Sequence, residues 1–276
     1  MYSSHMKKIY QLIALVGLLT SCAGPNAMLK EQSQWTIDGK EGSGISFHEG
    51  RGTFFIVTDE GSVVEVDQDG TLLRIKNIGI DNMEGVTTDP LLGNLYAVIE
   101  GKDRIIEINP DTFEVLREFT INRKLDGEKL IQGGKEGFEG ITFVADAAHP
   151  QGGTFYVVNQ ATANASKKEL SAVIELELPI RTGEPTKKGV FKGRIVRAFA
   201  SDVPGLSGIH FDATTKHLWV LSDTANLVME MNLDGDIVHR YGVPGDSQEG
   251  ITGALGTLYI VEDQPEGIVI HILQRS

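Results

Sequence analysis

The chain has almost no cysteine, little helical periodicity, and too few basic residues to balance its acidic ones. Its only cysteine, Cys22, excludes a disulfide framework and a zinc site built from several thiolates. The 38 acidic residues exceed the 25 basic ones, so a net charge of -13 opposes binding to nucleic acid and favours cations. We therefore expect no nucleic-acid partner.

Familiar catalytic motifs are also missing. The sequence contains no nucleophile elbow, no paired-histidine zinc helix and no glycine-rich phosphate loop. The hydrophobic content of 41% over 276 residues still supports a substantial core. Five histidines lie singly at strand-like positions, where we expect structural roles: His48, His210, His217, His239 and His271.

The first residues resemble a bacterial lipoprotein signal peptide. Lys7 and Lys8 precede an apolar stretch, residues 9–19, that is too short to span a bilayer, and the lipobox sequence LTSC ends at Cys22. The pattern predicts cleavage before Cys22, lipid attachment to it and anchoring in the cell envelope. The residue after the lipobox cysteine is Ala23 rather than the aspartate associated with retention in the inner membrane, so we expect the lipoprotein to lie in the outer membrane. The expected parts are a signal peptide at 1–22, a tether at 23–34 and a folded domain at 35–276.

Five similar segments follow, each predicted to hold four short strands. The second strand of each is rich in aromatic and β-branched residues, and the third alternates in polarity. Repeats of this kind predict an all-β fold, a five-bladed β-propeller of four-stranded blades. The opening phrases are SGISF at Ser43, EGVTT at Glu84, EGITF at Glu139, SGIHF at Ser207 and EGITG at Glu249.

The fifth segment has only three strands before the chain stops at Ser276. An open edge would remain unless a strand from elsewhere joined it. The sequence QWTIDG, residues 34–39, alternates in the right way just ahead of the first segment. We expect Trp35 and Ile37 to close the last blade from the N-terminal side.

The chain resembles the SdiA-regulated family of bacterial propeller proteins. The resemblance is carried by the order of the opening phrases, together with the longer stretches LSGIHFDATTKHLWVLSD and QEGITGALGTLYIVED. The resemblance covers residues 35–273. It implies a five-bladed propeller distantly related to NHL-repeat propellers, and a calcium site, but no particular activity. The insertion after Gln160 departs from the family's compact pattern.

The repeated glutamates predict a metal site. In a propeller the first strand of each blade lines the central channel, so Glu84, Glu139 and Glu249 should converge at one mouth. Gathered carboxylates repel one another, and no lysine or arginine recurs beside them. A hard cation with oxygen ligands, calcium, would offset the repulsion. A second set at the ends of the second strands could face the same mouth or cap turns: Asp59, Glu100, Asn159, Asp223 and Glu262.

Two function classes stay open at this point. The first is a lipid-anchored monomeric propeller that binds calcium and engages an unknown small-molecule or protein ligand. The alternative is a calcium-dependent hydrolase of the lactonase, esterase or phosphodiesterase type, with Glu100 or Glu262 as a general base. Only analogy between folds supports the second class.

Overall fold

Strands and short turns make up the computed structural model, which describes residues 25, 27–102, 104–130, 137–160, 171–184, 189–264 and 267–275. Every regular element in these ranges is a β-strand, so the all-β expectation is confirmed. The described residues contain no helix with the length and apolar character needed to cross a membrane. The predicted signal peptide and its Cys22 lie outside the described residues.

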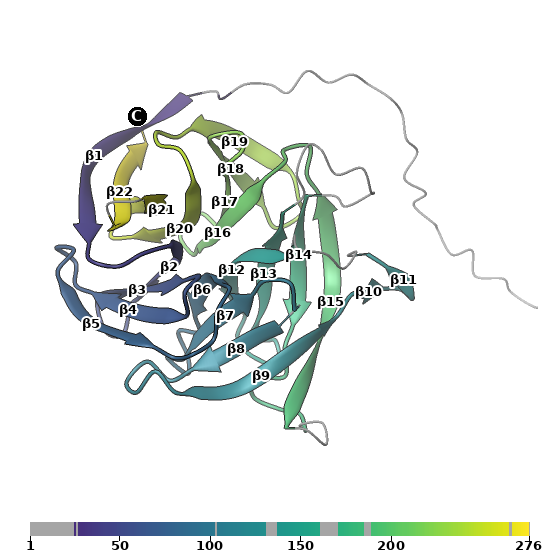
Figure 1. Cartoon of the computed structure of the whole chain (residues 1–276). Helices are drawn as coiled ribbons and strands as arrows, with labels where there is room; N and C mark the ends of the chain where they lie inside the picture. Colours follow the sequence, from purple (N-terminus) through teal and green to yellow (C-terminus); the bar gives the residue numbers. More distant parts are fainter. Residues whose placement is uncertain are drawn as a thin grey trace, which may run out of the picture.

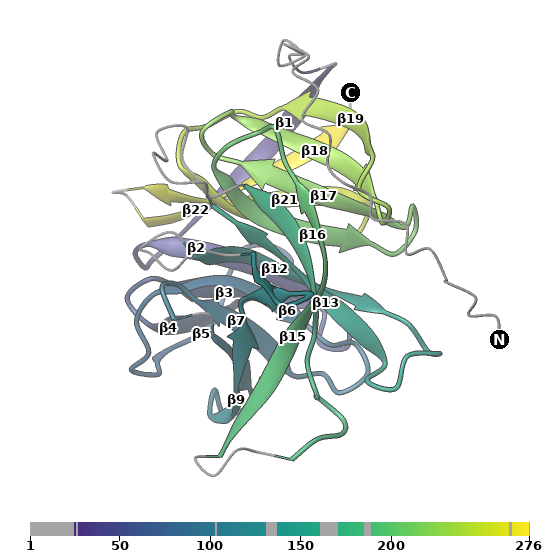
Figure 2. The same ribbon diagram turned by 90° about the vertical axis from the view of Figure 1, so that its right-hand side faces the viewer.

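The opening phrase of each repeat forms an innermost strand. These strands contact one another in chain order, and the last contacts the first, so they surround a common centre (Figure 1). Antiparallel strands step outward from each one, and the side view shows the resulting sheets fanned around the centre (Figure 2). The innermost strands are β2 (Gly42–His48), β6 (Met83–Thr88), β12 (Phe138–Ala145), β16 (Leu206–Asp212) and β20 (Gln248–Ala254).

The remaining strands complete the sheets. The first repeat continues with β3 (Thr53–Thr58), β4 (Ser62–Val66) and β5 (Leu72–Asn77). The second and third continue with β7 (Leu95–Ile99), β8 (Arg104–Ile108), β9 (Val115–Asn122), β13 (Gly153–Asn159), β14 (Ala172–Glu177) and β15 (Val190–Ala200). The fourth and fifth continue with β17 (His217–Ser222), β18 (Leu227–Asn232), β19 (Ile237–Gly242), β21 (Thr257–Gln264) and β22 (Gly267–Arg275). A small hairpin joins β10 (Lys124–Leu125) and β11 (Glu128–Lys129).

An N-terminal strand, β1 (Ala27–Ile37), pairs antiparallel with β22, so the predicted closure is confirmed. Trp35 lies opposite Ile270, and its ring packs 5.5 Å from that of Tyr259. The strand begins at Ala27, inside the range expected to be a tether. The reason is burial, because Leu29 is only 3% exposed and packs in the core of the fourth and fifth repeats.

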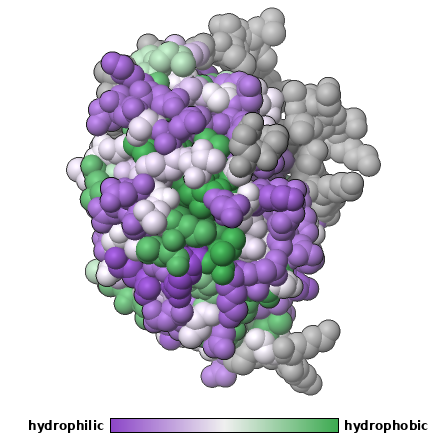
Figure 3. Space-filling model, turned by 60° about the vertical axis from the view of Figure 1, so that its left-hand side comes forward, coloured by the Kyte–Doolittle hydropathy of each residue, from purple (hydrophilic) through white to green (hydrophobic). Residues whose placement is uncertain are grey.

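Outer strands join neighbouring repeats. β9 runs parallel to β15, and β19 pairs in parallel with β1, which merges four repeats into two eight-stranded sheets. In the described chain β5 is the outer edge of a separate four-stranded sheet. It exposes Leu72, Leu73 and Ile75, and it lies on the side brought forward in Figure 3, where hydrophobic residues interrupt a mainly polar surface.

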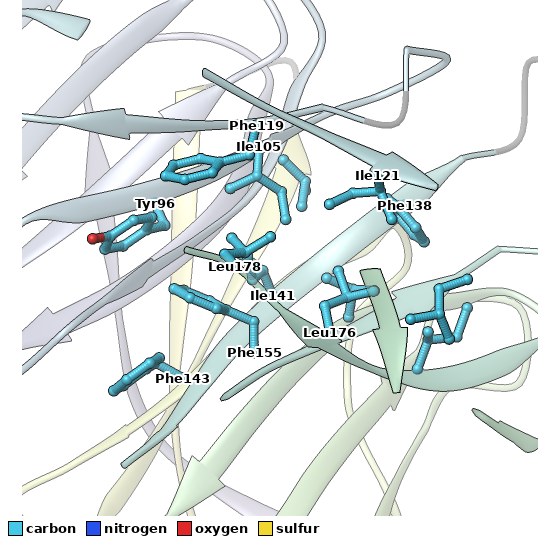
Figure 4. Packing of buried hydrophobic residues seen from close by; sticks show 14 of the residues in the cluster. Tyr96, Ile105, Phe119, Ile121, Phe138, Ile141, Phe143, Phe155, Leu176 and Leu178 are labelled. Atoms are coloured by element: carbon cyan, nitrogen blue, oxygen red, sulfur yellow. The ribbon is translucent and has the colours of Figure 1, made fainter. Parts of the chain in front are cut away.

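Aromatic and β-branched side chains fill the space between the sheets, as their strand propensity predicts. The largest cluster joins the second and third repeats and includes Tyr96, Phe119, Phe138 and Phe155 (Figure 4). Tyr96 and Phe155 lie with ring centroids 4.9 Å apart. This packing holds the inner strands in place and thereby positions their ends.

A buried glutamate recurs in the third strand of the first four repeats. Glu65, Glu107, Glu175 and Glu230 are all at most 8% exposed. The first three each pair with an arginine of the following strand, as Glu107 does with Arg117. Glu230 instead faces histidines, with His217 Nδ1 at 2.7 Å from its Oε1. Partnered charges of this kind are tolerated inside a protein because they satisfy one another.

Candidate metal centre

The glycine of each opening phrase allows the inner strands to approach closely. A Cβ built on Gly44 would lie 2.4 Å from the carbonyl oxygen of Glu84, and one on Gly85 would lie 2.4 Å from that of Glu139. The contacts continue around the centre until a Cβ on Gly250 would meet the Cα of Gly44 at 2.9 Å. Any side chain there would push the strands apart. The preceding residues therefore crowd around a narrow centre.

These preceding residues line a pocket of about 310 Å³, called the acid pocket below. Glu84, Glu139 and Glu249 come from three inner strands, and Ser43 comes from a fourth. The remaining lining residues are all polar: Glu41, Asp59, Asn82, Glu100, Gln160 and Asp263. Among the described lining residues there is no lysine, arginine, histidine or cysteine, so every charged group among them is a carboxylate.

A repeated backbone hydrogen bond holds the second-strand ends beside the inner strands. The amide of Asp59 donates to the carbonyl of Glu41 at 3.1 Å, and that of Glu100 donates to Asn82 at 2.9 Å. Equivalent bonds bring Gln160, Asp223 and Asp263 into the same position in the other repeats. Several of the acceptors have positive φ, namely Glu41, Asn82, Gly205 and Ser247. Unfavourable backbone conformations in non-glycine residues are a recurrent feature of functional sites.

The structure brings most of the predicted residues together, but not all. Glu84, Glu139, Glu249, Asp59 and Glu100 line the acid pocket. Asp223 is absent from the lining, yet its charge acts on Glu139 and Glu249.

Asn159 and Glu262 lie elsewhere. Asn159 is buried at the end of β13, next to its neighbouring strands. Glu262 is 3% exposed and accepts hydrogen bonds from the amide of Asp246 and from His271 Nε2, the latter at 2.5 Å. The contacts of Glu262 place its side chain within its own repeat, and neither Asn159 nor Glu262 is in the pocket lining, because side chains alternate along a strand. The next residues, Gln160 and Asp263, therefore face the acid pocket.

That one-residue shift is visible in the sequence once the repeats are aligned. Asp59 follows Thr58, and Glu100 follows Ile99, so the pocket-lining residue comes directly after a buried one. The same rule selects Asp263 rather than Glu262. Glu41 carries no comparable signal, because its place depends on a positive φ that glutamate rarely adopts, whereas asparagine, as at Asn82, is a residue type that favours this conformation.

Burial and mutual repulsion make the acid pocket unfavourable for negative charge. Burial raises the pKa of Glu139 to about 10, and the charge of Glu84 adds to the shift. Burial also raises the pKa of Glu84 to about 8, with a contribution from Asp59. The pKa of Glu249 rises to about 7 for the same first reason. At neutral pH and without a cation, Glu139 and Glu84 therefore hold protons.

The donor set suits a hard cation in its chemistry. Glu139 is 7% exposed, and its Oε1 is buried with no hydrogen-bond partner among the described residues. Carboxylate, hydroxyl and amide oxygens are the ligands that calcium takes. The described residues do not, however, contain a group of three acidic, histidine or cysteine side chains close enough to one another to coordinate a metal ion without rearrangement. The pocket has room for on the order of ten waters at about 30 Å³ each, so water could complete a coordination shell.

Comparison with solved structures supports the fold. Glutaminyl cyclase from Myxococcus xanthus matches with a TM-score of 0.60 and 12% identity, covering 91% of this chain and 98% of that one. The Cps50 (Swd1) β-propeller domain of Myceliophteria thermophila matches with a TM-score of 0.50 and 9% identity, over 90% and 100% of the two chains. At such identities the likeness concerns the fold alone, which is a β-propeller.

Sequence comparison gives a narrower result. No curated protein matches the chain. The profile of the SdiA-regulated family matches residues 23–267, which is most of the chain and includes the five opening phrases. The chain therefore belongs to the SdiA-regulated family.

Proposed function

We propose that this protein is a calcium-binding β-propeller of the cell envelope that serves as a binding module, with its cation in the acid pocket. One observation carries the proposal: Glu139 Oε1 is a buried carboxylate oxygen that has no hydrogen-bond partner among the described residues and is surrounded by further carboxylates. A buried carboxylate in that position is costly unless it is protonated or bound to a cation. Each repeat would be one blade, giving five, which the cyclic contacts of the inner strands support.

Glu84, Glu139 and Glu249 would hold the cation, and Asp59, Glu100 and Asp263 would contribute oxygens directly or through water. A bound calcium ion would supply positive charge that keeps these carboxylates ionised. Magnesium should substitute poorly, because it requires tighter octahedral geometry and loses water reluctantly. A wide, hydrated ring of side chains from separate strands suits the larger ion better.

Calorimetric titration with calcium tests the proposal on the wild type, Glu139→Gln and Glu114→Gln. Glutamine is close in shape to a protonated glutamate but needs no proton uptake on folding, so Glu139→Gln should raise the metal-free melting temperature at neutral pH. It should weaken calcium binding and reduce the rise in melting temperature that calcium produces by mass action. Glu114 is exposed and distant in the fold, so Glu114→Gln should behave like the wild type. Absence of calcium binding to the wild type would overturn the proposal.

The location is part of the same proposal. Lipid attached to Cys22 would anchor a monomeric domain at the outer membrane, as the lipobox at residues 19–22 predicts. Expression of Cys22→Ala should then leave uncleaved precursor, while the wild-type protein should fractionate with membranes until detergent is added. Recovery of the processed wild-type protein in the soluble fraction without detergent would contradict the proposed lipid anchor.

Catalysis stays an alternative prediction. A calcium-dependent hydrolase would need a general base beside the cation, and Glu100 lines the acid pocket, whereas Glu262 does not. A screen of lactones, aryl esters and phosphodiesters, with calcium and then with chelator, separates the two functions. Turnover that chelator abolishes and that Glu100→Gln removes would establish the enzyme.

A further inference from the structure

A second and larger pocket lies at the far ends of three inner strands. β2, β16 and β20 each begin beside the acid pocket and end at this second one, where they contribute Phe47, His210 and Gly253. Ser43 and Phe47 are four residues apart on β2, which is roughly 13 Å of extended chain. The second pocket has a volume of about 710 Å³, within the range typical of small-molecule sites. It is called the far pocket below.

The far pocket has apolar and aromatic walls. Phe47 and Phe211 come from the two inner strands that flank β20, and Trp219 and Leu258 come from the strands behind. Leu273 of β22 also contributes. Walls of this kind accept the apolar body of a ligand and gain from its removal from water.

A neutral imidazole faces this space. Burial lowers the pKa of His210 to about 4, so the ring is uncharged at neutral pH. Neither ring nitrogen hydrogen bonds to a described residue, and Nε2 lies 2.6 Å from where a Cβ on Gly253 would stand. The glycine thus leaves room beside a ring that can accept one hydrogen bond and donate another.

The charged groups of the far pocket are acidic. Asp212 accepts hydrogen bonds from Thr214 N at 2.8 Å and Thr215 Oγ1 at 3.0 Å. Burial opposes its ionisation, but these bonds hold the pKa of Asp212 below its ordinary value. Glu49 is an exposed second carboxylate in the lining, and no lysine or arginine appears among the described lining residues. These carboxylates favour cations over anions in the pocket, although Lys216 Nζ lies 5.8 Å from the centroid of the Phe211 ring in its wall.

The rim carries a leucine in an unfavourable conformation. Leu255 occupies the turn between β20 and β21 with a φ of 54°, and its side chain is 66% exposed. A left-handed conformation is unfavourable for a residue with a side chain, and the exposure of Leu255 means that no burial compensates for it. Gly256, the other residue of the turn, has a φ of 79° without that cost. An apolar side chain held at the mouth can cover a ligand inside.

We propose that the far pocket binds a small organic ammonium compound. Its apolar body would lie among Phe47, Phe211 and Leu258, and its ammonium group would face Asp212 and Glu49. His210 would accept a hydrogen bond from the ligand. The proposed amine site does not require calcium, so it can be tested separately from calcium binding in the acid pocket.

The chain's two tryptophans, Trp35 and Trp219, provide the readout. Protein labelled with 5-fluorotryptophan and saturated with calcium would be titrated with 2-phenylethylamine and followed by ¹⁹F NMR. The Trp219 resonance should shift and saturate at millimolar amine or below, while the Trp35 resonance should not. Phenylacetate, of similar size and opposite charge, should give no saturable shift.

Variants locate the binding. Asp212→Asn preserves the turn's acceptor but removes the charge, and should weaken amine binding about tenfold, which corresponds to about 1.4 kcal/mol. Gly253→Ala should weaken it by crowding His210, and Glu114→Gln, at an exposed residue outside both pockets, should leave it unchanged. No saturable Trp219 shift in the wild type would overturn the proposal. Equal binding of phenylacetate, or full affinity in Asp212→Asn, would overturn the assigned ligand class.

Discussion

At the scale of single residues, Glu139 has the largest pKa shift among the three inner-strand glutamates of the acid pocket. Its pKa lies at about 10, so the folded, metal-free protein keeps a proton there that the unfolded chain releases near pH 4.5. Glu84 and Glu249 behave in the same way up to about pH 8 and pH 7. A raised pKa in an acid therefore lowers stability as the pH rises from about 4.5 to the folded value.

This yields a prediction for Glu84→Gln. In chelator, the difference in melting temperature between the variant and the wild type should grow in favour of the variant from pH 5 to about pH 8, because glutamine has no proton to lose. Calcium should reverse the difference, since it stabilises the ionised wild-type site. Thermal melts at several pH values measure both. A constant difference across this range would contradict the assigned pKa shift.

Single residues also show what could be predicted from the sequence. Glu84, Glu139 and Glu249 were placed together because a repeated phrase must occupy a repeated position. Asp263 was missed because a strand end can be misjudged by one residue, and one residue reverses the direction of a side chain. Glu41 depends on a left-handed turn, which no residue type in its surroundings signals.

At the scale of elements, the recurring glutamate of the third strand ties it to the strand outside it. Glu107 is 1% exposed and accepts hydrogen bonds from Arg117 Nη2, Tyr96 OH and Asn94 Nδ2 at 2.8 to 2.9 Å. The glutamate of the third strand and the arginine of the fourth are both visible in the sequence, as in RIIEI followed by VLREF. Its pairing depends on the register between strands, which the sequence alone leaves open.

We predict that Glu107→Ala destabilises the domain by about 3–5 kcal/mol, because it removes the only carboxylate paired with the partly buried guanidinium of Arg117 among the described residues, and the hydrogen-bond acceptor of Tyr96 and Asn94. Glu118→Ala is the matched control. It breaks a more exposed pair with Arg104, at 3.1 Å, and should cost about 0–1 kcal/mol. Denaturant unfolding of both variants gives the comparison. Equal costs would show that the buried pairs contribute no more than surface ones.

At the scale of the whole molecule, β1 links the start of the chain to its end. The closure by Trp35 and Ile37 was predicted because the fifth repeat lacked a strand. The extension of β1 back to Ala27 was not predicted, because it depends on the packing of Leu29 against residues of the fourth and fifth repeats, which are distant in sequence. The parallel pairing of β9 with β15 could not be predicted from the sequence either, because it depends on how the sheets of two repeats lie relative to each other.

Truncation distinguishes the strand from a tether. A domain that starts at Ala27 should be as stable as one that starts at Ala23. A domain that starts at Gln32 should lose at least about 2–5 kcal/mol, the usual cost of removing a buried leucine, together with the pairing to β19. Chemical unfolding of the three proteins measures this. Unchanged stability of the shortest would show that β1 is required only from Gln32 onward.

The way in which outer strands join leaves one part of the ring less secured than the rest. β9 and β19 have neighbours on both sides, whereas β5 has only β4 among the described strands. Amide hydrogens in β5 should therefore exchange with deuterium through local opening, at a lower free energy than those of β9 or β19. The first repeat is then where this ring would begin to open, and its exposed leucines would be the first apolar surface offered to other chains.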